Sequence, residues 1–518
     1  MRIHSRENAI YAGRPPPIRL FRGRARPLVM RMLSVTATLA LVLDSGCAVG
    51  PNFTRPHAPD ATLNAQPLAP TANSPNVVGG EAQRFVTGAS VPEDWWTLFH
   101  SSQLDGLIDR ALANNPDLKA AQAALTAARE QVLAQRGAYY PGAAVGFSAS
   151  RQKQSQQIAP TPNANIFQYS LFTPQVTVSY VPDVFGLNRR AVESVKAQAQ
   201  AVRYQMIAAD ITLSANVAAA AIQAASLQSQ IDVTGQLVGL NTNMVAVLRS
   251  QYSAGYASRL DLAAQQAQLA QVRATLPSLR KQLAQQRDLL AVLTGQFPSR
   301  ASAVPLQLST LQLPHQLPVS LPAQLVTQRP DVLQAEANLH VASAQVGVAI
   351  ANRLPNVQLT ADIGSSALAI SQLFTSATGF LGVGGTLAAP IFQGGTLLHR
   401  ERAARAAYVQ AAAQYRSTVL TAFQNVADTL AALEQDADAL KAAAAAASAA
   451  EVTLQLSQQQ TRAGYAGYLS LLSAEQGEQQ ARINLVQAAA NRYLDTVALF
   501  QALGGGWWQR AAIVKDKH

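Results

Sequence analysis

Cysteine is almost absent from this sequence, and motifs for enzyme chemistry are missing as well. The single cysteine, Cys47, allows no internal disulfide and no cysteine-rich metal site. The seven histidines show no His-x-x-x-His spacing, and the chain has no Gly-x-Ser-x-Gly nucleophile motif. The sequence therefore predicts no catalytic residue, no metal and no cofactor, and an enzyme is not expected.

Long apolar runs are also missing after Cys47. No run there approaches the roughly 18 residues that a membrane-spanning helix requires. If the mature chain crosses a bilayer, it must therefore do so by strands, because only helices and closed barrels satisfy the backbone in lipid. Before Cys47, basic residues and the apolar run 32–43 are typical of a secretion signal, so 1–46 is interpreted as a signal peptide. Its length leaves Met30 or Met32 open as the true start.

The positive charge does not indicate a nucleic-acid partner. The formal charge is +11, but residues 1–46 hold eight arginines against Glu7 and Asp44, which leaves about half of the excess for the mature chain. No nucleic acid is predicted to bind.

Cys47 follows an apolar run and small residues, which is the acceptor position of a bacterial lipoprotein. This pattern predicts lipidation of Cys47 and attachment to outer-membrane lipid. Asp44 stands three residues earlier, where the processing signal prefers an apolar side chain, so an unmodified thiol is the alternative. Residues 47–92 are rich in Pro, Ala, Asn and Gly and are interpreted as a lipid-anchored, extended tether.

Two hairpins are predicted from strict alternation of apolar and polar residues. In the first, 145–149 and 176–180 alternate; in the second, 355–364 alternates and 380–387 returns. Each run has about the length of a tilted membrane strand. In 355–364 the apolar residues Val357, Leu359, Ala361 and Ile363 are predicted to face lipid. The polar residues Asn356, Gln358, Thr360 and Asp362 are predicted to face a water-filled lumen.

Very long helices follow each hairpin. From Leu187 to about Tyr252 apolar residues recur at helical spacing without a proline, which predicts a rod of roughly 100 Å. A break at 254–258 precedes a returning helix over 259–293. The segment from Thr396 to Ala463 has neither proline nor glycine and predicts a second rod.

The whole plan occurs twice. Residues 116–141 align with 330–355 without a gap, and Ala254-Gly-Tyr-Ala257 matches Ala463-Gly-Tyr-Ala466. We therefore expect two structural repeats of helix, β-hairpin, long helix and returning helix. The predicted boundaries are a first repeat at 93–297, a Pro-rich linker at 298–322, a second repeat at 323–506 and a C-terminal tail at 507–518.

Four strands cannot close a membrane barrel, because the smallest known barrels need about eight. Open sheet edges in lipid would leave backbone groups unpaired at several kcal/mol each. If the strands enter a membrane, the protein must be an oligomer. Two copies would give a side-chain-filled lumen, and three would leave room for water.

Several separated motifs resemble the TolC-like outer-membrane efflux proteins, in particular their NodT branch. They are Cys47-Ala-Val-Gly-Pro-Asn-Phe-Thr-Arg-Pro56, Trp95-Trp96, Leu321-Pro322, Arg329-Pro330-Asp331-Val332, Ala335-Glu336, Gln345-Val346-Gly347, Leu354-Pro355, Pro390-Ile-Phe-Gln-Gly-Gly395 and Gly504-Gly-Gly-Trp507. The resemblance implies a mainly α fold with a small membrane β-barrel contribution: a homotrimer with a 12-strand barrel and a 12-helix periplasmic tunnel. It also implies a passive exit duct for drugs or other small toxic compounds, joined by a periplasmic adaptor (membrane fusion) protein to an inner-membrane pump.

By this resemblance, adaptor hairpins dock at the two helix-turn-helix breaks, which form the periplasmic aperture. The residues concerned are Gly255, Tyr256, Leu260, Asp261, Gly464, Tyr465, Leu469, Ser470 and Ser473. Relatives often place acidic residues in the second turn, where this chain has Ser470 and Ser473. That departure argues against an acidic cation-binding constriction. We expect gating by small rotations of the returning helices.

Two other functions fit the same sequence. One is the outer-membrane channel of a type I protein-secretion system; the other is a periplasmic lipoprotein scaffold whose hairpins never enter lipid. The transported substrate is not predicted, because a duct of this kind selects little.

Overall fold

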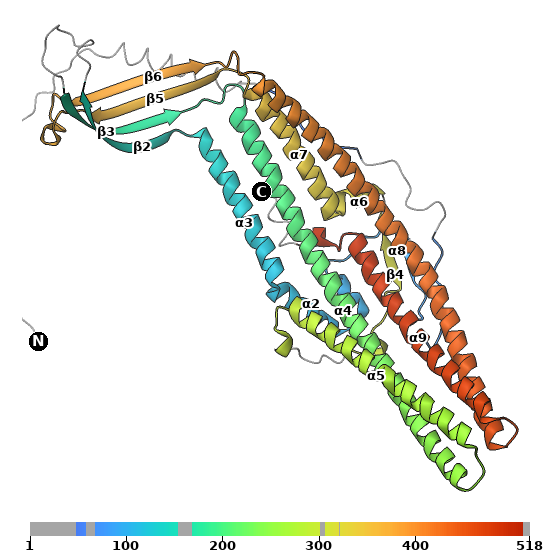
Figure 1. The fold of residues 1–518 in the computed structure, drawn as a ribbon. Coiled ribbons are helices and arrows are strands. Elements are labelled where there is room, and N and C mark those ends of the chain that lie inside the picture. Colours follow the sequence, from blue (N-terminus) through green and yellow to red (C-terminus); the bar gives the residue numbers. More distant parts are fainter. Residues whose placement is uncertain (1–47, 58–67, 154–167, 301–305, 321, 511–518) are drawn as a thin grey trace, which may run out of the picture. The chain divides into compact units, whose positions relative to one another are not determined.

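The computed structural model describes residues 48–57, 68–153, 168–300, 306–320 and 322–510, all within one unit, Ala48–His518. Cys47, with its predicted lipid, and the signal segment lie outside the described residues. Helices dominate, and the strands that are described form a four-stranded sheet and a two-stranded sheet. Figure 1 shows the four-stranded sheet at one end of this unit and the turns of the long helices at the other.

The same succession of elements occurs twice along the chain. The first is α3 (Pro116–Arg136), β2 (Gly142–Lys153), β3 (Gln168–Tyr180), α4 (Leu187–Ser253) and α5 (Arg259–Leu293). The second is α7 (Pro330–Ala351), β5 (Asn356–Ser365), β6 (Gly379–Ala388), α8 (Thr396–Arg462) and α9 (Tyr468–Ala502). The helices α4 and α8 have 67 residues each, and α5 and α9 have 35 each.

Local sequence explains where these helices begin and end. Asn115 caps α3, because its side chain accepts hydrogen bonds from the backbone N–H groups of Asp117 and Leu118, and Pro116 occupies the first turn. The rods α4 and α8 each follow a glycine with positive φ, Gly186 at 80° and Gly395 at 83°. At 1.5 Å per residue each rod is about 100 Å long.

The four-stranded sheet is antiparallel, with the order β2-β3-β5-β6. The two hairpins therefore meet at β3 and β5, and β2 and β6 are the outer strands. The helices that continue these strands contact one another in the same order, α3 with α4, α4 with α7 and α7 with α8 (Figure 1). One layer of helices thus extends the sheet, with α3 and α8 at its margins.

The main hydrophobic core lies midway along the helices. Trp95, in a short 3-10 helix, is fully buried and stacks on Phe500 of α9, with ring centroids 5.3 Å apart. Trp96 and Trp507 are buried too. The short helices α2 (Ser102–Asn114) and α6 (Pro322–Gln328) lie beside this region.

The segments interpreted as tether and linker are packed more closely than the sequence indicated. The strand β1 (Arg84–Thr87) pairs in parallel with β4 (Gln316–Val319). Leucines of the Pro-rich segment, Leu311 and Leu317 among them, are buried in the main core. Proline spacing reports where helices stop, but it carries no information on such long-range burial.

An 18-residue window of α4 is long and apolar enough to cross a bilayer by length and composition, and 56% of that window is buried inside the protein. The expectation that no such stretch follows Cys47 overlooked this window. Its burial is that of a helix packed in a protein interior.

Candidate channel, turn and anchor surfaces

The predicted polar residues of β5 share one face of the sheet. Asn356, Gln358, Thr360 and Asp362 alternate along the strand, and the register pairs Asp362 with Thr177 of β3. The Thr177 hydroxyl donates a 2.6 Å hydrogen bond to Asp362 Oδ1. On the other side, Gln358 pairs with Thr386 of β6. Small polar side chains therefore continue across neighbouring strands on this face.

The opposite face of the sheet is apolar and exposed in the single chain. Val357, Leu359, Ala361 and Ile363 lie on it, as the alternation predicts, and the register places Val178 and Val383 beside Ala361. Val383 is 80% exposed and Val145 of β2 is 84% exposed. A contiguous apolar face of this kind requires a partner or lipid to cover it.

The two helix-turn-helix breaks reverse the chain through left-handed glycines. Gly255 has φ of 81° and Gly464 has φ of 78°, and nothing lies within 4 Å of the position that a Cβ would take at either. The adjacent tyrosines are almost fully exposed: Tyr256 is 86% exposed and Tyr465 is 89% exposed. Leu260 and Leu469 are exposed as well. The turns thus present apolar and aromatic side chains to solvent.

Asp261 belongs to a capping box at the start of α5. Its backbone N–H donates to Ser258 Oγ at 3.1 Å, and its carboxylate accepts from the Ser258 backbone N–H at 3.2 Å. In the second turn, the Ser470 hydroxyl donates to the carbonyl of Gly467 at 2.7 Å, and Ser473 is exposed. Asp261 and Ser470 therefore stabilise helix starts, whatever else they do.

A buried polar cluster lies near the turns, and sequence analysis did not find it. Gln265 of α5 is fully buried; its side-chain amide donates to Asn241 of α4 at 2.8 Å and to Glu475 of α9 at 3.3 Å. Gln476 of α9 donates to Gln268 of α5 at 2.7 Å. These bonds join the α4–α5 pair to α9. Helices rich in Ala and Gln give no sequence signal that singles these positions out.

The cluster contains two buried carboxyl groups. Burial raises the pKa of Glu475, the hydrogen bond from Gln265 lowers it in part, and the nearby Glu478 raises it further, so the net shift is upward. Burial also raises the pKa of Glu478, although Arg482 donates to it at 3.2 Å. Glu475 and Glu478 are therefore held inside the helix packing, two and five residues beyond Ser473.

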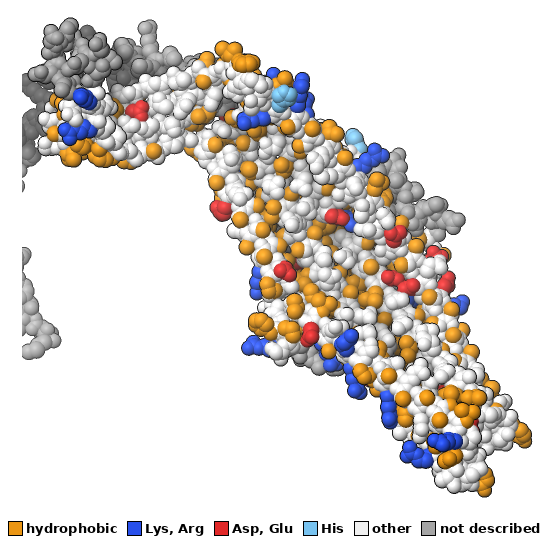
Figure 2. All heavy atoms as spheres, in the orientation of Figure 1, with side chains coloured by type: hydrophobic (Ala, Val, Ile, Leu, Met, Phe, Trp, Pro, Cys, Tyr) orange, Lys and Arg blue, Asp and Glu red, His pale blue; other side chains and the backbone are white. Residues whose placement is uncertain are grey.

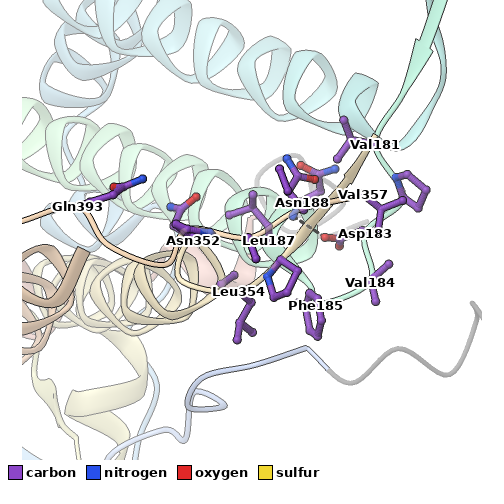
Figure 3. A pocket seen from close by; sticks show the side chains of 17 residues that line it. Val181, Asp183, Val184, Phe185, Leu187, Asn188, Asn352, Leu354, Val357 and Gln393 are labelled. Atoms are coloured by element: carbon purple, nitrogen blue, oxygen red, sulfur yellow. Dashed lines mark hydrogen bonds between the residues drawn. The ribbon is translucent and has the colours of Figure 1, made fainter. Parts of the chain in front are cut away.

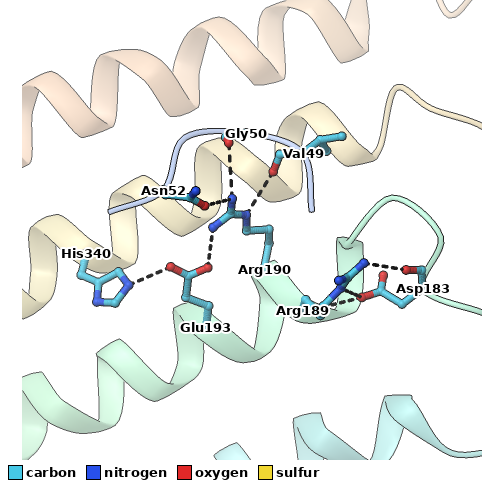
Figure 4. Close-up of polar contacts among 8 residues, drawn as sticks. All are labelled: Val49, Gly50, Asn52, Asp183, Arg189, Arg190, Glu193 and His340. Atoms are coloured by element: carbon cyan, nitrogen blue, oxygen red, sulfur yellow. Dashed lines mark hydrogen bonds and ion pairs between the residues drawn. The ribbon is translucent and has the colours of Figure 1, made fainter. Parts of the chain in front are cut away.

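An arginine clamp holds the N-terminal segment against the helices at the sheet end of the unit (Figure 4). Arg190 of α4 donates to the carbonyls of Val49 at 3.0 Å and Gly50 at 3.3 Å, and to Asn52 Oδ1 at 2.8 Å. It also pairs with Glu193 at 2.7 Å. A Cβ on Gly50 would lie 2.5 Å from the Gly347 Cα of α7, so only glycine permits this close approach.

The clamp continues to His340 on α7. Its Nε2 lies 2.8 Å from Glu193 Oε1, and its ring stacks on Phe53 with centroids 4.3 Å apart. Burial acts to raise the pKa of Glu193, but the hydrogen bonds from His340 and Arg190 outweigh it and lower the pKa below its ordinary value. The residues that directly follow Cys47 are thus fixed where the helices meet the sheet.

A cavity of 390 Å³ lies at the same junction (Figure 3). It is lined mainly by the connections between strands and helices, including Phe185, Leu354 and Pro390. Asp183 stands at its wall, where its carboxylate accepts from the backbone N–H groups of Asn188 and Arg189 at 2.8 Å each. Among the described residues, no group of three His, Cys, Asp or Glu side chains could hold a metal ion.

The model of the outer membrane efflux protein family matches residues 107–296 and 321–505 of this chain. The chain belongs to that family. Family members are efflux channels rather than enzymes, and the function of this protein is efflux through the outer membrane.

Curated relatives and a solved structure agree with this assignment. The chain is 29% identical over 491 residues to the outer membrane protein OprJ of Pseudomonas aeruginosa, covering 93% of this chain and 97% of that one. It is 29% identical over 484 residues to the toluene efflux pump outer membrane protein TtgC of Pseudomonas putida, with 92% and 96% covered. The structure of VceC from Vibrio cholerae superposes with a TM-score of 0.75 at 26% identity, covering 81% of this chain and 100% of VceC.

Proposed function

We propose that three copies of this chain assemble around one axis into a continuous duct. Four strands from each copy form a 12-strand barrel in the outer membrane, and α3, α4, α7 and α8 from each copy form a 12-helix tunnel through the periplasm. The duct is the passive exit of a tripartite efflux system. In this proposal the two stretches 93–297 and 323–506 are structural repeats that contribute equivalent parts of the wall.

The unpaired outer strands of the sheet are evidence in favour of the proposed trimer. In the chain, β2 and β6 are the outer strands, and they run in opposite directions because the sheet is antiparallel throughout. The β6 strand of one copy can therefore pair with β2 of the next without breaking the antiparallel pattern. Closure removes edges that would cost several kcal/mol for each unpaired backbone group in lipid.

The chemistry of the two sheet faces supports a barrel that closes with its polar face inside. The face with Asn356, Gln358, Thr360 and Asp362 suits a wet lumen, and the face with Val357, Leu359, Ala361 and Ile363 suits lipid. This separation of the polar from the apolar face is the observation on which the proposal chiefly rests.

An adaptor site, a lipid anchor and a class of cargo complete the proposed system. The exposed Tyr256 and Tyr465 at the turns are the docking site for a periplasmic adaptor, which connects an inner-membrane pump. Lipid on Cys47 anchors each copy in the membrane beside the junction where Arg190 holds residues 49–52. The cargo is a drug or another small toxic compound, as the names of relatives such as the toluene efflux protein suggest.

Two measurements test the proposal. Purified protein reconstituted into planar bilayers should conduct ions, and single cysteines at Val357 and Asn356 should differ in labelling: the first reacts with a lipid-soluble maleimide and the second with a charged one. Protein without an added cysteine is the control for Cys47. A monomer in detergent that passes no ions, or identical labelling at both positions, would overturn it.

A further inference from the structure

The loop between β6 and α8 carries two apolar side chains that touch little of their own chain. Ile391 is 98% exposed and Phe392 is 87% exposed. Their neighbours Pro390 and Gln393 line the junction cavity, whereas Ile391 and Phe392 do not. Figure 2 shows hydrophobic side chains gathered over this connection. Two adjacent exposed apolar residues of this size indicate a surface that another chain covers.

The strand register predicts which residues of a neighbouring copy would lie beside this loop. Ala388, the last residue of β6, pairs with Asn356, and Gly142, the first residue of β2, pairs with Ser179. Both pairs stand at the helix end of the sheet. When β6 of one copy lies antiparallel to β2 of the next, Ala388 and the next copy's Gly142 therefore stand at the same end. Two residues before Gly142, separated from it by Pro141, is Tyr140, which is 73% exposed.

The two outer helices, α3 and α8, carry opposite charges at about the same distance from the sheet. Glu130 lies six residues before the end of α3, and Arg402 lies six residues after the start of α8, so each is about 9 Å from the sheet end of its helix. Both are exposed. At 100° per residue, Glu130 projects away from the buried Val132 of α3, and Arg402 projects away from the buried Tyr415 of α8. Each charge thus lies on the margin that a neighbouring copy would meet.

We propose that a second copy of this chain covers the β6–α8 loop: Ile391 and Phe392 of one copy pack against Tyr140 of the next, and Arg402 pairs with Glu130 below them. This seam rests on the proposed trimer and adds to it the side chains that join adjacent copies. It places an apolar and aromatic contact at the membrane boundary and an ion pair immediately below it on the periplasmic side. The contact is repeated at each copy boundary, because a ring assembly uses the same two surfaces throughout.

Disulfide cross-linking of full-length protein in native membranes tests the apolar contact. The double variant Phe392→Cys with Tyr140→Cys should give linked dimers and trimers on non-reducing gels after mild oxidation. The matched control, Phe392→Cys with Tyr256→Cys, places the second thiol at the far end of the helices and should give monomers, as should each single variant. Linked species in the controls, or none in the double variant, would overturn the contact.

Charge reversal tests the ion pair. Arg402→Glu should lower the temperature at which trimers dissociate on native gels, and the added change Glu130→Arg should restore it. Failure of the second change to restore stability would overturn the pairing. Wild-type protein is run beside both experiments. A conducting wild-type trimer without the cross-link refutes the seam alone, whereas an absent trimer refutes the seam and the proposed assembly together.

Discussion

Gln265 on α5 donates its side-chain amide to the Glu475 carboxylate on α9 across 3.3 Å, in a region where both side chains are buried. Among the described residues, the hydrogen bond from Gln476 of α9 to Gln268 of α5 is a second polar side-chain contact between these helices. Movement of one helix pair relative to the other therefore has to break or stretch this bond. The protonation of Glu475 thus acts on the same packing that a rotation of the returning helices would change.

Replacing Glu475 with Gln should flatten the pH dependence of stability. Burial raises the pKa of Glu475, so the folded protein holds this proton more tightly than the unfolded chain does. The free energy of unfolding of the wild type should therefore rise as the pH falls from neutral toward the ordinary carboxyl range near 4.5. Glu475→Gln removes this contribution, while Glu478 retains its own.

Thermal melting at pH 7.5 and pH 5, followed by circular dichroism in detergent, measures the difference. The exposed Glu434→Gln on α8 is the control for the loss of one glutamate charge from a long helix. An equal rise in melting temperature for the wild type and Glu475→Gln would contradict the assignment.

Replacing Arg190 with Ala should release the N-terminal segment. The side chain is 5% exposed, and its loss leaves three acceptors on residues 49–52 and one carboxylate oxygen of Glu193 without their donor. We expect a loss of about 2 to 4 kcal/mol in the free energy of unfolding, as for other broken buried networks.

Limited proteolysis gives a local readout for the same variant. Cleavage near residues 48–57 should become faster in Arg190→Ala. The adjacent Arg189→Ala is the matched control: Arg189 is 39% exposed and pairs with Asp183 away from this segment, so its loss should cost about 1 kcal/mol or less. Unchanged cleavage in Arg190→Ala would show that the segment is held by other contacts.

A bulky charge at Ser473 should raise the leak of the closed channel. Ser473 is exposed on α9 one turn beyond the helix start. If the apertures of three copies converge there, Ser473→Lys places three like charges close together, and their repulsion favours separation. Single-channel recording should show a higher resting conductance, and Ser473→Ala should not. A closed channel in Ser473→Lys would move the constriction to another position.

Charged substitutions at the turn tyrosines should separate docking from conduction. Tyr256→Asp with Tyr465→Asp exposes no new core, because both side chains are already solvent-exposed. We expect normal trimers and conductance but a loss of efflux, measured as increased drug susceptibility of a strain that depends on this protein. Replacing the exposed Tyr408 of α8, far from the turns, is the control. Normal resistance in the double variant would place the adaptor elsewhere.

The sequence was a good guide wherever local chemistry decides the structure. The helix α5 was predicted over 259–293 and is found as Arg259–Leu293, because Ser258 caps its start and the glycine-containing segment at 295 ends it. The two faces of β5 were predicted residue by residue, because alternation is a property of the strand alone.

Long-range contacts could not be predicted, because local sequence patterns describe one helix or strand at a time. Arg190 looked like one basic residue among several at a helix start, yet it holds residues about 140 positions earlier. Leu311 and Leu317 looked like part of a proline-rich connection, yet they are core residues. Glu475 resembles any solvated glutamate of a long helix until the partner helix is placed against it. Nothing in periodicity encodes which distant segment will cover a given position.

Arg492 of α9 is fully buried and donates to the carbonyl of Gly79, 413 residues earlier, and to the side chains of Thr71 and Gln83. These acceptors are synthesised about 400 residues before the guanidinium that binds them. Residues 71–83 therefore cannot take their final hydrogen-bonded positions until α9 has been synthesised. Packing of residues 71–83 thus depends on α9, and a chain that ends before α9 lacks the buried side chain that binds this segment.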